Sequence, residues 1–164
     1  MSESIDQLLS RAESVLTKLQ AAVERVANLA LEFGCDIGDI GRELTLHPEL
    51  ASKVRAFIER TAPIVRMDNR LTSWIHRVYD AAESRSSDED DYVRALGMRS
   101  DLQFFCDLYR DSVAAYYVSG IEPVETDANL REWSADQYID DVPPGIPASH
   151  VWWHQSRRRP PRVE

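Results

Sequence analysis

The chain has few cysteines, and this scarcity excludes a disulfide-stabilised fold. Cys35 and Cys106 are the two cysteines among 164 residues, and neither lies in a CxxC or zinc-ligand pattern. Small secreted domains that depend on disulfides carry several pairs. We therefore expect two reduced, buried thiols, with one long-range disulfide as the alternative.

Long hydrophobic runs are also missing. No stretch approaches the roughly 18 uncharged apolar residues of a transmembrane helix. The first residues, MSESID, are polar and acidic and lack the basic and apolar regions of a secretory signal. The apolar fraction of 43 % is typical of a globular domain, so we expect one folded, cytoplasmic domain.

Basic residues are outnumbered by acidic ones. There are 19 lysines and arginines against 28 aspartates and glutamates, which gives a net charge of −9. General nucleic-acid binders are usually basic because they must neutralise phosphates. We therefore do not expect nucleic acid as a partner.

Helical periodicity dominates the first part of the chain. Ser4 and Gln7 have the spacing of a capping box and predict a helix start. From Ile5 to Phe33, apolar residues recur at steps of three and four in two neighbouring rows. This pattern predicts one long helix over about 4–33, ended by Gly34 and packed against two or more neighbours.

The next segment, Gly34–Gly41, carries three glycines. Their spacing matches no phosphate-binding motif, so we interpret the segment as an interhelical loop. Gly97 and Ser100 predict a break in a later helix. Apolar periodicity predicts further helices over about 48–61, 65–83, 88–96, 102–118 and 127–139.

These segments together predict an all-α fold. We expect residues 1–142 to form a compact bundle of about four to six helices with a long N-terminal helix. Residues 143–164 are rich in proline, tryptophan and arginine and predict an irregular C-terminal tail.

Motifs for catalysis are scarce, and the chain lacks GxSxG and paired-carboxylate magnesium motifs. Arg70 and His76, separated by five residues in a predicted helix, resemble the R-x4–6-H motif of all-α HEPN ribonucleases. The resemblance implies metal-independent RNA cleavage across a dimer, with His76 as acid or base and Arg70 on the phosphate. The chain departs from the motif at Leu71, where a polar residue is usual.

Metal binding has one weak candidate. His150 and His154 would share one face of a helix at zinc-ligand spacing, but the segment has no glutamate that would make it HExxH. Two tryptophans stand between the histidines and Pro147 precedes them closely. We therefore expect neither a metal nor a cofactor.

Protein binding is the function that this composition favours. Three carboxylates lie four residues apart (Glu132, Asp136, Asp140). On a helix their negative charges would repel one another unless arginines of the chain or a basic partner surface neutralise them. Trp152 and Trp153 could bind a partner or fill a groove between helices. We expect a non-enzymatic inhibitor, immunity protein or small subunit, with the HEPN-like ribonuclease as the alternative. The expected partner-binding residues are Glu132, Asp136, Asp140, His150, Trp152, Trp153, Arg157 and Arg158.

Overall fold

A computed structural model describes residues 3–22, 24–161 and 163. The fold is mostly helical, as predicted, and the end of the predicted tail at Arg162 and Glu164 lies outside the described residues. No helix of the described residues is both long and apolar enough to cross a membrane. The helices are α1 (Ile5–Ala21), α2 (Val26–Leu46), α3 (Ala51–Met67), α4 (Thr72–Glu83), α5 (Glu89–Tyr109), α6 (Ala115–Ser119), α7 (Val124–Trp133) and α8 (Val151–His154).

Short elements complete the fold. Two 3₁₀ turns, η1 (Pro48–Leu50) and η2 (Asn69–Leu71), precede α3 and α4. Strand β1 (Tyr138–Ile139) pairs in parallel with β2 (Arg157–Arg158), which attaches the end of the chain to the segment after α7. The helix predicted over 127–139 was wrong in its extent, because α7 ends at Trp133.

The long N-terminal helix was predicted wrongly. The capping box of Ser4 and Gln7 forms, but α1 ends at Ala21 and α2 begins at Val26. Arg25 has φ 60°, the left-handed conformation that reverses the chain. Both helices pack against one core, so the apolar period continues through a turn that has no glycine or proline to mark it.

The three glycines predicted to form a loop lie inside α2. Gly34, Gly38 and Gly41 share one face of the helix, since they are spaced four and three residues apart. A Cβ atom at these positions would overlap Trp74, Asp101 and Phe104, respectively. Glycine here allows α4 and α5 to approach α2 closely, which is a packing role rather than a turn.

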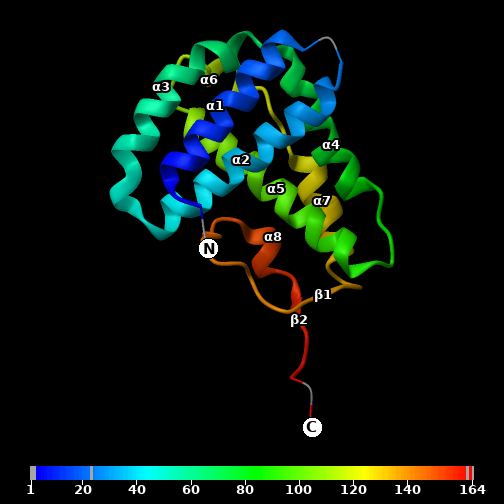
Figure 1. The fold of residues 1–164 in the computed structure, drawn as a ribbon. Helices are drawn as coiled ribbons and strands as arrows, with labels where there is room; N and C mark the ends of the chain where they lie inside the picture. The colour runs from blue at the N-terminus through cyan, green and yellow to red at the C-terminus, as the bar shows by residue number, and fades with distance from the viewer. Residues whose placement is uncertain (1–2, 23, 162, 164) are drawn as a thin grey trace.

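Helix α5 lies at the centre of the molecule, in contact with α2, α4, α6 and α7 (Figure 1). The predicted break at Gly97 and Ser100 was wrong, because α5 runs through both residues. The pattern is interrupted by Arg99, Ser100 and Asp101, three consecutive buried polar residues. Successive side chains on a helix point about 100° apart, so these three face α7, the C-terminal segment and α2 in turn.

Two clusters of buried side chains flank α5. The N-terminal core joins α1 to α4 with the second half of α5 and with α6. The C-terminal core joins the first half of α5 to the chain from α7 onward, and its members are Ala82, Tyr92, Ala95, Leu96, Leu130, Trp133, Ile139, Trp152 and Trp153.

Both cysteines are free, as expected. Contrary to expectation, neither is buried: Cys35 is exposed and Cys106 is partly buried.

Candidate protein-interaction surface

The aromatic C-terminal segment, expected to contact a partner, packs into the chain itself. Trp152, Trp153 and His150 are buried in a groove beside α5. The two indole Nε1–H groups donate to Ser100 Oγ at 3.0 and 2.9 Å, and His150 Nδ1 lies 2.9 Å from the same oxygen. Two roles were predicted for these tryptophans, binding a partner or filling a groove between helices. In the structure they fill a groove.

The hydrogen bonds define the state of His150. Because two indoles donate to Ser100 Oγ, its hydroxyl hydrogen is left to donate to His150 Nδ1, which places the imidazole proton on Nε2. Burial, together with the nearby Arg99 guanidinium, lowers the pKa of His150 to about 4. His150 is thus neutral at pH 7.

The predicted pair of metal ligands is divided between the interior and the surface. His150 stacks on Trp152 with ring centroids 4.8 Å apart, whereas His154 is exposed. Within the described ranges, no group of three or more histidine, cysteine, aspartate or glutamate side chains is placed to hold a metal ion.

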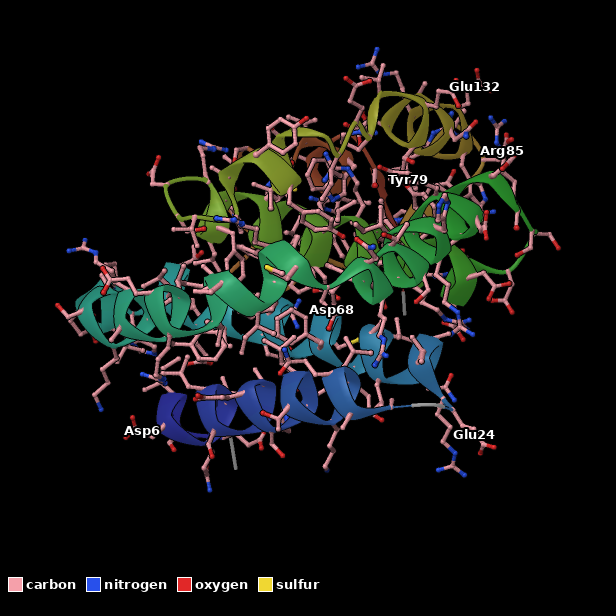
Figure 2. The ribbon with its side chains drawn as sticks, turned by 90° about the horizontal axis from the view of Figure 1, so that it is seen from above. Asp6, Glu24, Asp68, Tyr79, Arg85 and Glu132 are labelled. Carbon is pink, nitrogen blue, oxygen red and sulfur yellow. The ribbon has the colours of Figure 1, made fainter. Side chains whose placement is uncertain are left out.

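The predicted acidic row is not on one helix, and two of its three members pair with arginines of the chain. Glu132 lies on α7 and accepts from Arg85 at 2.5 Å, and Figure 2 shows the two at one edge of the molecule. Asp140 lies beyond β1 and accepts from Arg159 at 2.9 Å. Asp136 is exposed in the bend between α7 and β1. The chain's own arginines, one of the two predicted partners of this row, therefore neutralise much of it.

The two expected basic contact residues lie on β2 and are exposed. The Arg158 guanidinium is 4.0 Å from the Asp141 carboxylate. Arg157 lies over the Tyr138 ring at 6.0 Å from its centroid. Arg157 thus lies beside a residue of β1, and Arg158 lies beside the chain that follows β1.

Arg70 and His76 have separate surroundings. Arg70 Nη1 donates to the carbonyl oxygens of Leu19 and Gln20, the latter at 2.9 Å, so it caps the C-terminal end of α1. His76 is exposed on α4, where its ring meets Tyr79 edge-on at 6.3 Å. Arg70 therefore has a structural role that accounts for its position.

A surface not expected from the sequence lies around α6. Tyr116 is 93 % exposed, the largest value for an aromatic residue in the described part of the chain. Val113, also exposed, lines the same hollow as Tyr116, and the exposed Met67 and Val124 directly follow the lining residues Arg66 and Pro123 in the chain. We call these four residues, together with one hollow between α3 and α6 and another between α5 and α6, the Tyr116 surface. Helix α6, which carries Tyr116, lies at the end of the molecule opposite α8 and the strands (Figure 1).

Tyr116 stands between two hollows. The α3–α6 hollow, of about 670 Å³, is lined by Arg66, Val113, Tyr116, Tyr117, Ser119 and Gly120. The α5–α6 hollow, of about 460 Å³, is lined by Arg99, Leu102, Gln103, Cys106, Arg110, Ala115, Tyr116, Val118, Ser119, Ile121 and Pro123.

The sequence pattern assigned Val113 and Tyr116 to the buried face of a helix over 102–118. The structure ends α5 at Tyr109 and starts α6 at Ala115. Ser112 causes part of this change, since its hydroxyl donates to the Tyr109 carbonyl and accepts from the Ala114 amide. The turn changes the helical phase, so Val118 faces the core and Tyr116 faces solvent.

The fold is thus that of an all-α bundle with a docked C-terminal segment. Comparisons with protein-family models, with curated proteins and with solved structures each found no match.

Proposed function

We propose that this protein is a non-enzymatic protein-binding module that acts through the Tyr116 surface. The observation that carries the proposal is the position of Tyr116, 93 % exposed between two hollows and beside Val113. Large apolar side chains grouped on a surface rimmed by polar groups are typical of protein-interaction sites.

The residue types support a protein partner. Tyrosine and arginine are enriched among the residues that dominate binding energy, and methionine is enriched in interface cores. Tyrosine offers a large apolar ring and a hydroxyl while ordering few torsions. Tyr116 would serve as the anchor, and the hollows on either side would receive side chains of the partner.

This proposal changes the contact residues that we predicted from the sequence. His150, Trp152 and Trp153 would have to leave the C-terminal core to touch a partner, and Glu132 and Asp140 already pair with arginines. A partner with a basic surface and a ribonuclease activity of Arg70 and His76 stay predictions. No observation on the described residues favours either of them.

The test is affinity capture from the native host with matched baits. We expect a specific protein to be captured by the wild-type chain and lost with Tyr116→Ser, because the anchor is removed without disturbing the core. Val151→Ser is the control, since Val151 is exposed on α8 at the opposite end of the molecule. Equal capture by Tyr116→Ser and the wild type would refute the proposal.

A further inference from the structure

The two hollows beside Tyr116 have an unusual charge for this chain. Their lining residues among the described part of the chain include Arg66, Arg99 and Arg110 and no aspartate or glutamate. The whole chain carries a net charge of −9, with 28 acidic residues against 19 basic ones. The lining of the two hollows therefore presents guanidinium groups, of which Arg99 and Arg110 pair with aspartates outside the lining, Asp127 and Asp107.

Arg99 lines the α5–α6 hollow, and its guanidinium also lies over the Trp152 ring, 4.1 Å from the ring centroid. Its side chain is 4 % exposed. Asp127 accepts from Nε at 2.6 Å and from Nη2 at 3.2 Å, and Gln103 accepts from Nη2 at 3.0 Å. Nη1 is buried and has no hydrogen-bond partner among the described residues. A buried guanidinium whose N–H groups lack acceptors costs folding free energy, so an added acceptor would stabilise it.

The other two arginines are accessible. Arg110 follows α5 and pairs with Asp107, and its side chain remains 65 % exposed. Arg66 is exposed at the end of α3 and forms no ion pair with a described residue. Guanidinium groups bind carboxylates in a planar, bidentate geometry.

We infer that the partner presents an acidic segment, with carboxylate side chains entering the hollows on either side of Tyr116. The inference rests on the proposed function and specifies the partner's chemistry. Apolar wall residues such as Leu102, Val118 and Ile121 would contact the aliphatic part of each acidic side chain.

The geometry favours a polypeptide over a small anion. Tyr116 and Ser119 line both hollows, so one ligand that covers Tyr116 reaches both. Arg99 lies in α5 and Arg110 directly follows it in helical conformation, so the eleven residues between their positions correspond to about 16 Å along the helix axis and to nearly the same face. A chain with several carboxylates spans that length, whereas a single small carboxylate occupies one end.

The experiment uses the intact chain and a defined probe. Two capped peptides are built from leucine, alanine and, at matched positions, either glutamate or glutamine. The Nε–H NMR signals of the arginines in the ¹⁵N-labelled protein report binding. We expect the glutamate peptide to shift the signals of Arg66, Arg99 and Arg110 and the glutamine peptide to leave them unchanged. Arg110→Gln should weaken binding about tenfold.

Arg94→Gln is the matched control. Arg94 lies in α5 and, like Arg110, pairs with an aspartate three residues before it; its side chain is 69 % exposed. The Arg94→Gln variant should bind the glutamate peptide with the same affinity as the wild type. Equal weakening by both variants would show a non-specific charge effect and overturn the inference. So would equal binding of both peptides, or no shift at millimolar glutamate peptide.

Two further arms separate the alternatives. Saturation of the same signals by N-acetylglutamate as tightly as by the peptide would overturn the inference in favour of a small-molecule site. In the capture experiment, a partner lost with Tyr116→Ser but retained with the Arg66→Gln/Arg110→Gln double variant would keep the proposed function and overturn the acidic segment. Capture unaffected by Tyr116→Ser would remove the function itself.

Discussion

The two cores on either side of α5 are built by different means. The N-terminal core is mainly aliphatic and phenyl side chains from helices, with one buried hydroxyl pair, Thr61 and Tyr109, at 2.8 Å. The C-terminal core is rich in tryptophan, and Ser100 alone binds three of the surrounding side chains. An apolar core tolerates substitutions that conserve volume, whereas the loss of a shared polar atom leaves all of its buried partners unsatisfied. The C-terminal segment should therefore depend on single hydrogen-bonding groups more than the helical bundle does.

Ser100→Ala should have the largest effect on stability. It leaves both indole N–H groups buried without an acceptor and removes the donor to His150 Nδ1. Each unsatisfied buried group costs about 1–3 kcal/mol, so we expect a loss of about 4 kcal/mol in the free energy of unfolding, measured by urea denaturation. A loss below about 1 kcal/mol would contradict the special role of the polar group in the C-terminal core.

Gly38→Ala should be the next most damaging change, and it tests packing on the N-terminal side of α5. The new Cβ would overlap the buried Asp101 carboxyl group, so we expect a loss of about 3 kcal/mol in the free energy of unfolding. Gly97→Ala on α5 is the control, because nothing lies within 4 Å of its added Cβ. It should stabilise the chain by about 0.5–1 kcal/mol through helix propensity. Equal effects at the two glycines would contradict the close-approach role of α2.

The pH dependence of stability distinguishes the two sides of α5 through one titrating group on each. Burial raises the pKa of Asp101 to about 8 from 3.8, against the opposing effect of Arg42 at 3.3 Å. The folded chain therefore holds a proton on Asp101 that the unfolded chain lacks between these values, so stability falls as pH rises through this range. His150, with its pKa lowered to about 4 from 6.5, makes stability fall as pH drops through that lower range.

The two slopes oppose each other between pH 4 and 6.5, and the Asp101 slope stands alone above that range. We expect the free energy of unfolding to decrease by about 2 kcal/mol from pH 6.5 to 8, at about 1.4 kcal/mol per pH unit. In Asp101→Asn this decrease should disappear, and the acid-side loss from His150 should become visible. If the free energy of unfolding of Asp101→Asn falls over this pH range as much as that of the wild type, a group other than Asp101 causes the decrease.

Thr61→Val should have the smallest effect of the series and provides the N-terminal counterpart of Ser100→Ala. The substitution removes the hydrogen-bond partner of the Tyr109 hydroxyl and keeps the shape of the side chain. We therefore expect a loss of about 1.5 kcal/mol in the free energy of unfolding. Adding Tyr109→Phe should recover part of this loss, because the unsatisfied hydroxyl is then gone. A cost as large as that of Ser100→Ala would remove the contrast between the cores.

The sequence predicted the features that depend on local periodicity. The all-α class, the capping box of Ser4 and Gln7 and much of the apolar core of α1 and α2 follow from the spacing of apolar residues. It did not predict the turn between α1 and α2, since both helices bury the same kind of face. It did not predict the Tyr116 surface, since the turn between α5 and α6, to which Ser112 contributes a hydrogen bond, changes the helical phase.

Composition and helical period by themselves therefore determined that this chain folds as a helical bundle. Only the tertiary structure decided which polar and aromatic side chains are buried in the interior. Gly38 has a packing role because Asp101 lies against it, and Trp152 is held in the interior because its indole N–H donates a hydrogen bond to Ser100 Oγ. The physical reason is that burial and hydrogen bonding depend on neighbours distant in the chain, and a local pattern contains no information about them.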